Sequence, residues 1–377
     1  MESKKGKVGV NSVLIGFILI VFSPTIRTFG PFTSNAAKQA GWLSPIVAGV
    51  IYIYFILKLN TLLVQHPGLS LLEIYEKIIG KILAKIIAFV YLTWLTISIG
   101  LNLRSYSHRI SAVLYPNVVE ELFIVILLFV IALFLVKPGL IIAFRVYIVL
   151  AGITIVGSAL LTTLMLPMVN VENLLPITYL DVIPMIKGSA IALSYWSYIT
   201  PIFIYSDDII GMRYFKKRGL TAVAYIAVTT TIILATIYGI AGSTILSRSS
   251  FPYLLVVEQI QLLDSLQGFD AILAFLLIFS DVALISFLIL ICLKLMKYIF
   301  NIKDASIYTY IFIVLCYYTA IGLAENSYEL KDFSNNIATY VFIGLFVFIP
   351  ILMSWIYKIR TRAVKALIKS NHAKKQA

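Results

Sequence analysis

Two apolar stretches of the sequence contain proline among hydroxyl-bearing and aromatic residues. Residues 22–31 read FSPTIRTFGP, and residues 195–201 read YWSYITP. Proline inside a helix removes a backbone N–H donor and clashes with the preceding turn, so neighbouring backbone groups need other partners. A small polar ligand can supply them, and the N-terminus of a half-helix favours a carboxylate. The two breaks predict a binding site for a zwitterion or a similar small molecule, with packing kinks in membrane helices as the alternative.

Two ionisable side chains, Arg27 and Asp281, lie inside apolar runs, where such groups are costly and mark functional sites by default. Arg27 lies beside the first break. It is expected to bind a ligand carboxylate or form a gate ion pair, or else to extend to the outer headgroups. Asp281 follows Ser280 in the middle of another apolar run. It is expected to bind a proton or cation or to pair with Arg27, with a structural hydrogen bond to a helix end as the alternative.

Further candidates share a helix face or flank the breaks. Tyr91, Trp94 and Ser98 are spaced by three and four residues, so they lie on roughly one face. They can line a pocket against the run that holds Asp281, with aromatic packing as the alternative for Trp94. The predicted ligand-binding residues are Ser23, Pro24, Thr25, Arg27, Thr28, Tyr91, Ser98, Tyr195, Tyr198, Thr200, Ser280 and Asp281.

Asp207 and Asp208 are expected to end the second broken segment at the inner surface. There they can close the inner side through ion pairs with Arg213 or Lys137. A solvated acidic surface is the alternative, because exposed ion pairs contribute little.

Other kinds of chemistry have no support in the sequence. There is no Walker motif, no GxSxG, no HExxH and no pair of catalytic acids, so an enzyme is not expected. Cys292 and Cys316 lie in apolar runs without metal-ligand spacing, and they are expected to be small buried residues. His66 and His108 have no suitably spaced metal partners. No metal and no cofactor are therefore predicted.

Composition places these residues in a membrane protein. Apolar residues make up 61% of the 377 residues and charged residues only 12%, too few charges for a water-soluble surface. Long runs without period-two alternation exclude membrane strands and indicate helices that cross a bilayer. The expected spans are Val8–Phe32, Trp42–Val64, Ile82–Ile110, Leu122–Val136, Leu140–Leu166, Gly188–Gly211, Leu220–Leu246, Ala271–Tyr298, Ala305–Ala324 and Ile337–Tyr357.

Lys and Arg are distributed unevenly between the two sides of these spans. When the N-terminus is placed inside, most of the 30 basic residues fall on inner segments, as the positive-inside rule expects. Both ends are then cytoplasmic, and the basic tail 358–377 is expected near anionic headgroups. The net charge of +13 thus indicates a membrane surface rather than nucleic acid. The outer segments contain Lys38, Arg104, Arg109, Lys187, Arg248 and Lys331.

Two connections read as amphipathic helices in matching positions. Ser70 and Glu73 form a capping box that starts an inner helix after the second span. A second helix, from about Pro252 to Gln267, is expected on the outer surface after the seventh span. An amphipathic helix at the matching place in each half, on opposite faces of the membrane, indicates a 5+5 inverted repeat. We therefore expect one all-α integral membrane domain over 1–377, with about ten transmembrane helices, broken helices 1 and 6, and repeats of about 8–166 and 184–357.

This order of elements resembles the APC-type (LeuT-like) transporter fold, and within it the chain resembles the spore germination permease family. The resemblance covers nearly the whole chain through short motifs in a consistent order. They are AGWL at 40–43, PGLSLLE at 67–73 leading to IGK at 79–81, LR at 103–104 to YP at 115–116, GL at 139–140 to FR at 144–145, and NLLP at 173–176. The first span departs from the glycine-rich stretch common in the family.

The resemblance implies the B subunit of a nutrient germinant receptor. Such a subunit senses an amino acid or another small nutrient in the spore inner membrane, beside an A subunit with soluble domains and a lipoprotein C subunit. The residues leave a second function open, an amino-acid permease coupled to H⁺ or Na⁺ through Asp281 or nearby hydroxyls. A channel for ions or water along the same pathway is a third reading.

Overall fold

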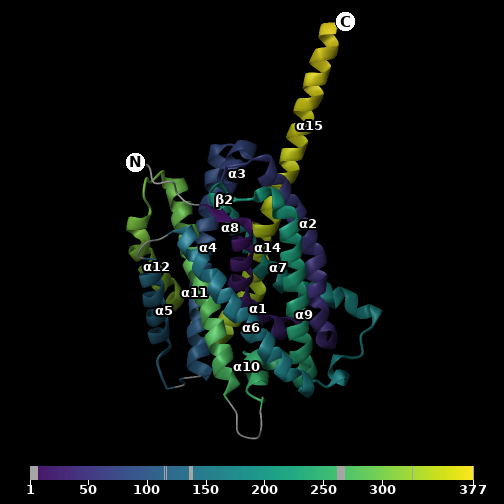
Figure 1. Cartoon of the computed structure of the whole chain (residues 1–377), viewed down its shortest axis with the longest axis vertical. Helices are drawn as coiled ribbons and strands as arrows, with labels where there is room; N and C mark the ends of the chain where they lie inside the picture. Colours follow the sequence, from purple (N-terminus) through teal and green to yellow (C-terminus); the bar gives the residue numbers. More distant parts are fainter. Residues whose placement is uncertain are drawn as a thin grey trace.

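The computed structural model describes residues 7–113, 115, 117–135, 139–260, 268–324 and 326–376. Figure 1 shows a bundle of helices that run mostly along one axis, with connecting helices at both ends. In the first half the elements are β1 (Val8–Gly9), α1 (Val10–Ala37), the 3₁₀ helix η1 (Lys38–Leu43), α2 (Ser44–Gln65), α3 (Leu71–Ile79), α4 (Lys81–Val113), α5 (Glu120–Phe134) and α6 (Leu140–Met165).

The second half follows three short 3₁₀ helices, η2 (Leu166–Met168), η3 (Val171–Leu174) and η4 (Tyr179–Asp181). Its elements are α7 (Val182–Trp196), α8 (Ile199–Ile202), η5 (Phe203–Asp208), β2 (Ile209–Ile210), η6 (Met212–Tyr214), α9 (Phe215–Arg248), α10 (Pro252–Val257), α11 (Phe269–Phe300), η7 (Ser306–Tyr308), α12 (Thr309–Gly322), α13 (Ser327–Asp332), the π-helical turn Phe333–Ala338, α14 (Thr339–Ile343), the π-helical turn Gly344–Phe348 and α15 (Ile349–Gln376).

The described residues of each predicted span lie mostly on helical segments of the structure. In the described part of the chain, six helical stretches are long and apolar enough to cross a membrane, and the first of them contains both α1 and α2. The fourth, sixth and ninth predicted spans fall on shorter helices, namely α5, the α7–α8 pair and α12. The tail predicted after Tyr357 continues as helix α15 and projects from the bundle (Figure 1).

The structure adds one feature that the sequence did not predict. Val8 and Gly9 pair in parallel with Ile209 and Ile210, so the chain just before α1 lies beside the chain after η5. This two-residue pair ties the start of the first predicted span to the end of the sixth.

The first predicted amphipathic helix is confirmed as α3, with the Ser70–Glu73 capping box present. The backbone N–H of Ser70 donates to the Glu73 carboxylate at 2.7 Å. Glu76 of α3 also accepts from the Tyr298 hydroxyl of α11 at 2.8 Å. Leu71, Leu72, Ile74, Tyr75 and Ile78 are buried, so α3 packs onto the bundle with its apolar face.

The predicted outer helix is confirmed only at its start. Pro252 occupies the first turn of α10, as expected, but the helix ends at Val257 and a turn follows. The remainder of the predicted helix, 261–267, lies outside the described residues. Figure 1 places α10 at the end of the bundle opposite α3.

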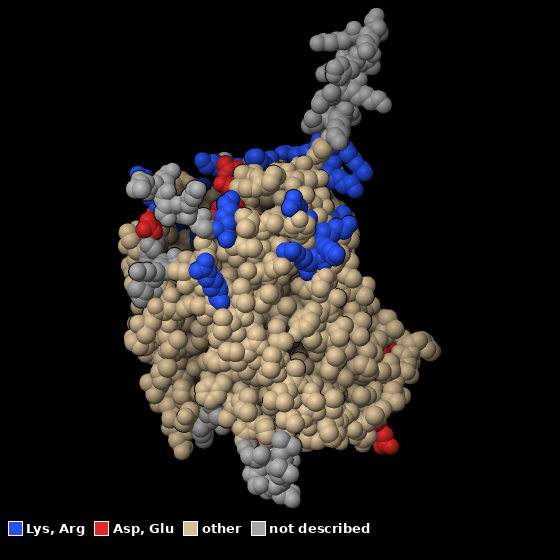
Figure 2. All heavy atoms as spheres, viewed as in Figure 1, with Lys and Arg blue, Asp and Glu red and all other residues tan. Residues whose placement is uncertain are grey.

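Lys and Arg gather at the end of the bundle that carries α3, β1 and the projecting α15 (Figure 2). We call this end the basic side and the end that carries α10 the far side. The described start of the chain and its last helix both emerge on the basic side.

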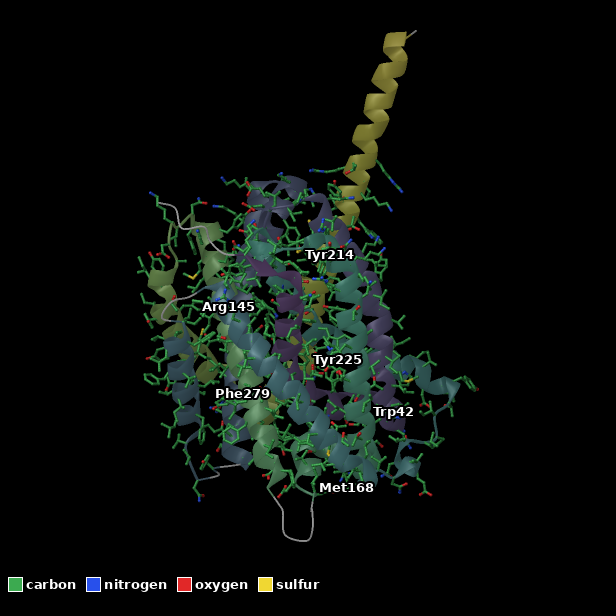
Figure 3. The ribbon with its side chains drawn as sticks, in the orientation of Figure 1. Trp42, Arg145, Met168, Tyr214, Tyr225 and Phe279 are labelled. Atoms are coloured by element: carbon green, nitrogen blue, oxygen red, sulfur yellow. The ribbon has the colours of Figure 1, made fainter. Side chains whose placement is uncertain are left out.

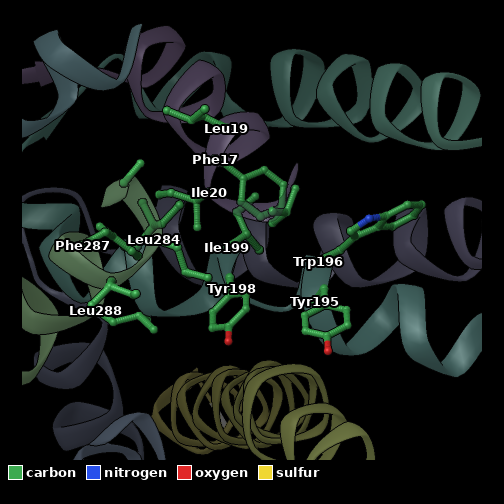
Figure 4. Packing of buried hydrophobic residues seen from close by; sticks show 14 of the residues in the cluster. Phe17, Leu19, Ile20, Tyr195, Trp196, Tyr198, Ile199, Leu284, Phe287 and Leu288 are labelled. Atoms are coloured by element: carbon green, nitrogen blue, oxygen red, sulfur yellow. The ribbon is translucent and has the colours of Figure 1, made fainter. Parts of the chain in front are cut away.

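The core of the bundle forms where α1, α8 and α11 meet (Figure 4). α1 contacts α6, α7, α9 and α11. In the most apolar 18-residue stretch of α11, 83% is buried inside the protein. A membrane helix of such burial is surrounded by protein rather than by lipid. The residues packed there include Phe17, Ile20, Ile199, Leu284 and Phe287.

Gly41 fits a close approach between η1, α1 and α9. A Cβ atom at residue 41 would lie 2.7 Å from the carbonyl oxygen of Thr33 and would also meet the Tyr238 hydroxyl. These two neighbours are themselves joined, because the Thr33 and Tyr238 hydroxyls are 2.8 Å apart.

We expect Gly41→Ala to destabilise the protein by about 1 to 3 kcal/mol through overpacking, measured as a lower Tm in detergent. Gly152→Ala is the control, since a Cβ there meets open space; equal Tm values for the two variants would contradict this account.

Candidate functional site

The Ser280 hydroxyl of α11 is inserted into the hydrogen-bond ladder of α1. The backbone N–H of Ser23 donates to Ser280 Oγ at 2.8 Å, and Ser280 Oγ donates to the Leu19 carbonyl at 2.6 Å. In an uninterrupted α-helix the Ser23 N–H would itself bond to the Leu19 carbonyl. Pro24 has no N–H, so the next bond of the ladder is missing as well. α1 is therefore opened at this turn on the side that faces α11.

The two predicted breaks differ in form. α1 continues as one helix from Val10 to Ala37 with Pro24 and Pro31 inside it. The first span is therefore not divided into two helices, as the prediction of a broken helix 1 had it. The inserted hydroxyl bridges the missing bond and keeps the helix together. In the sixth span, α7 ends at Trp196, and a turn at Ser197 and Tyr198 separates it from α8.

An ion pair between Arg109 of α4 and Asp281 of α11 lies directly beside the opened turn. Their side chains are 1% and 0% exposed, and Arg109 Nη2 donates to Asp281 Oδ2. Arg109 Nη1 also lies 3.4 Å from the Ser23 hydroxyl. The guanidinium sits 5.7 Å from the centre of the Tyr106 ring. The pair thus joins three helices at one point.

The partner of Asp281 differs from the predicted one. Arg27 was the expected partner, and Arg109 was assigned to an outer segment; instead Arg109 is buried and neutralises Asp281. The pair leaves two polar atoms, Arg109 Nε and Asp281 Oδ1, buried without a hydrogen-bond partner. Such atoms are costly in a dry interior, so a water molecule or a ligand atom reaching them would be stabilised.

Arg27 takes part in a second buried network one turn beyond Pro24. Its Nη2 donates to Asn102 Oδ1 at 3.2 Å. Asn102 Nδ2 in turn lies 3.3 Å from the Tyr198 hydroxyl and donates to the Ser98 carbonyl at 2.8 Å. This network connects α1, α4 and the turn between α7 and α8. Arg27 is 8% exposed, so its guanidinium lies inside the protein and not among outer headgroups.

A cavity of about 70 Å³ adjoins Arg27. Arg27 Nη1 is buried and has no hydrogen-bond partner, which leaves one cationic donor unsatisfied next to the cavity. The rim also carries His108, which lies 3.0 Å from the Glu120 carboxylate. We call this space the Arg27 cavity; it is bordered by Arg27, Thr28, Pro31, Ser105, His108, Ser250, Phe251, Leu330, Lys331, Ser334 and Asn335.

Of the predicted ligand-binding residues, Arg27 and Thr28 border this cavity. Ser23, Pro24, Ser280 and Asp281 lie at the opened turn, and Tyr198 is reached through Asn102. Tyr195 is near the rim, because its hydroxyl is 3.5 Å from Ser334 Oγ. Thr25 points to a different cavity, between α1, α6 and α9.

On the helical face with Tyr91, Trp94 and Ser98, the first two residues contact the segment 333–346. Tyr91 donates to the Leu345 carbonyl at 2.9 Å, and the Trp94 ring contacts the Phe333 and Phe342 rings. Thr200 likewise donates to the Phe346 carbonyl at 2.5 Å. These hydroxyls satisfy carbonyls in a widened π-helical turn, a structure often found at functional sites. Ser98 donates to the Trp94 carbonyl of its own helix.

The acidic pair at the end of η5 is held by Lys294 of α11. Lys294 Nζ lies 2.5 Å from Asp207 and 3.3 Å from Asp208, and it sits 4.1 Å from the centre of the Tyr205 ring. The predicted partner Arg213 instead stacks on Tyr214, and Lys137 lies outside the described residues. This cluster links η5 to α11 on the basic side.

Sequence reasoning missed Arg109 and Asn102. Arg109 lies at the end of a predicted span, where a charge is expected to belong to a loop or to face the headgroups, and Asn102 lies two turns further inside. The spacing of polar residues along the helix could have identified both residues, however. Asn102, Ser105 and Arg109 are spaced by three and four residues on α4, which is one polar face of an otherwise apolar helix.

Comparisons with known proteins agree with this architecture. A family described as "Spore germination protein" matches residues 12–328. A nucleobase-cation-symport-1 family transporter, solved in a closed conformation with bromovinylhydantoin bound, superposes with a TM-score of 0.66 at 12% identity, covering 92% of this chain and 78% of that one. A Na⁺-coupled sialic acid symporter in a substrate-bound outward-open state gives a TM-score of 0.62 at 10% identity, covering 91% and 79%. A search of curated proteins found no match. At these identities the two transporters show a shared fold.

Removal of the inserted hydroxyl should weaken the α1–α11 contact. Ser280→Ala deletes the bonds to Ser23 and Leu19, and we expect a loss of about 1 to 3 kcal/mol, seen as a lower Tm and a changed exchange rate of the Ser23 amide hydrogen. Ser98→Ala is the control, because that buried hydroxyl bonds only its own helix. A Tm loss in Ser98→Ala as large as in Ser280→Ala would contradict the role of the inserted hydroxyl.

The Arg109–Asp281 pair should behave as a unit. Asp281→Leu leaves a buried guanidinium unpaired, and we expect a cost of about 3 to 5 kcal/mol. Arg109→Met in the same chain removes the unpaired charge, so the double variant should recover most of the lost Tm. Additive losses in the double variant would show that the two residues do not depend on each other.

Proposed function

This chain belongs to the spore germination protein family, and we propose that it is the membrane-embedded nutrient-sensing subunit of a spore germinant receptor. The observation that supports this function best is the Arg27 cavity beside the opened turn of α1. A buried guanidinium with one unsatisfied donor is suited to a carboxylate, and an amino acid carries one.

The proposed orientation follows the charges. With the basic side in the cytoplasm, as the positive-inside rule favours, the far side faces outward and the Arg27 cavity lies toward the nutrient. Both described ends of the chain are then cytoplasmic. The family supports the further proposals that the membrane is the spore inner membrane and that A and C receptor subunits are the partners.

The ligand acts by favouring one arrangement of the helices. α1 is held to α4 and α11 through Ser280 and Arg109, and to the α7–α8 turn through Asn102. A carboxylate that recruits Arg27 Nη1 changes the network of which Asn102 and Tyr198 are part. It can shift the equilibrium only by its difference in affinity for the two arrangements. The shift is what partner subunits would detect.

A coupled amino-acid permease is the second candidate, favoured by the shared fold with the two symporters. In that function a proton or Na⁺ would bind near Asp281. The neighbouring guanidinium opposes this, because it already neutralises the carboxylate; coupling through Asp281 requires Arg109 to move away. The sensor is therefore our first proposal.

Liposomes that contain the purified chain distinguish the two functions. Labelled amino acids are screened for saturable binding and for accumulation under imposed proton and sodium gradients. Binding without accumulation supports the sensor. Accumulation that follows a gradient supports the permease, and loss of the pH and Na⁺ dependence in Asp281→Asn would then assign the coupling to that carboxylate.

Replacement of Arg27 should weaken nutrient binding specifically. Arg27→Gln removes a charge-assisted bond to the carboxylate, and we expect affinity to fall about 10- to 100-fold, measured by equilibrium binding of the labelled nutrient identified in the screen. Arg248→Gln is the control, since it removes an exposed positive charge at the far-side end of α9. Equal affinities in the two variants, with Tm unchanged, would place the ligand elsewhere.

A further inference from the structure

A second cavity, distinct from the Arg27 cavity, lies on the opposite face of α1. It has a volume of about 250 Å³ and is formed by α1, α6 and α9. Figure 2 shows a hollow on this face of the molecule, and Figure 3 places Tyr225 of α9 beside it. Exposed Tyr225 and Ile232 stand at its edge. Because these helices are membrane spans, the cavity opens toward the acyl chains of the bilayer.

The lining of this cavity is neutral. It combines aliphatic side chains such as Ile18 and Ile155 with hydroxyls from all three helices, and no described residue that lines it is charged. Thr25 is 4% exposed, and its hydroxyl has no hydrogen-bond partner. Thr162 and Thr229 donate to carbonyls of their own helices. A space of this kind accepts a hydrocarbon chain and excludes ions.

A third cavity, of about 630 Å³, continues from the second toward the basic side. The two share Ile18 and Tyr225 in their linings, and the third adds Tyr214, Lys217 and Arg218. Arg218 stacks on the Tyr214 ring with 5.0 Å to its centre. Neither Lys217 nor Arg218 forms an ion pair with a carboxylate in the described part of the chain. The basic end of the groove therefore offers two uncompensated positive charges.

The length of the groove matches one leaflet. Lys217 and Thr229 are twelve residues apart on α9, which corresponds to about 18 Å along the helix. Half of a hydrocarbon core of roughly 30 Å is about 15 Å. A headgroup at Lys217 therefore places the acyl chain at the level of Thr229 and Thr25.

We propose that this continuous groove binds one anionic phospholipid. Its phosphate lies at Lys217 and Arg218, and one acyl chain enters the neutral cavity against α1. A soluble phosphate would use only the basic end and leave the neutral cavity without an occupant. The lipid contacts the face of α1 opposite the turn opened by Ser280, so its chain supports α1 against α6 and α9. This proposal does not depend on the proposed nutrient.

Native mass spectrometry of the purified full-length chain tests the headgroup. The delipidated protein is titrated with phosphatidylglycerol or phosphatidylcholine of identical acyl chains. We expect one saturable phosphatidylglycerol site with affinity at least about tenfold above that for phosphatidylcholine, since each basic residue near the surface adds to binding. Lys217→Gln with Arg218→Gln should abolish the difference, whereas Lys77→Gln with Lys81→Gln, an equal charge change on α3 and the start of α4, should preserve it.

The acyl chain is tested by filling the neutral cavity. Thr229→Phe places a ring in the space that the chain would occupy, so the affinity for phosphatidylglycerol should fall about tenfold or more. Val228→Phe adds the same ring at the exposed neighbouring residue, which does not line the cavity. The affinity for phosphatidylglycerol should be unchanged in this variant. The proposal is overturned if the two double charge variants show the same preference for phosphatidylglycerol over phosphatidylcholine. It is also overturned if Thr229→Phe and Val228→Phe bind phosphatidylglycerol with the same affinity, or if soluble glycerol phosphate displaces the bound lipid. Tm values of all four variants report that each is folded.

Discussion

The buried ion pair between Arg109 and Asp281 constrains every helix around it. Two charges in a dry interior stay together, because separating them leaves an uncompensated charge. Asp281 follows Ser280 directly, so the pair also fixes the hydroxyl that enters the ladder of α1. α1 cannot slide along α11 unless it exchanges these bonds for others. The opened turn at Ser23, and with it the position of Arg27 one turn away, follows from this constraint.

Other hydroxyl groups in the core also donate to the backbone of a neighbouring helix. Tyr91 and Thr200 donate to carbonyls of the π-helical turn at 344–348, as Ser280 does to α1. In each case a side chain from one helix satisfies the backbone of another, which is necessary where a membrane interior offers no water. Irregular turns are thus fixed in place by neighbouring helices. The π-helical turn at 344–348 adjoins α14, which contacts α7, and α7 in turn contacts α1.

The two ends of the bundle are held by different forces. On the basic side, Lys294 binds the acidic residues at the end of η5, and α3 is tied to α11 through Glu76 and Tyr298. On the far side, the Arg27 cavity leaves a cationic donor without a partner. The basic side is thus held by charged and polar pairs, whereas on the far side one buried donor has no partner. The proposed phospholipid would add a contact from the bilayer to the face of α1 that lines the neutral cavity.

The sequence by itself predicted where the apolar helices run, the amphipathic helix α3 and the kind of fold. Hydrophobic length sets where helices cross a bilayer, and local pairs such as Ser70 and Glu73 set where they begin; both are properties of short stretches. It also marked Pro24, Arg27, Ser280 and Asp281 as unusual. Only the tertiary structure decided their partners, since Ser23 and Ser280 lie 257 residues apart and Arg109 and Asp281 lie 172 apart. Arg27 and Arg109 have the same chemistry and both occur near span ends, so nothing local distinguishes which one meets Asp281; the packing of α4 against α11 does.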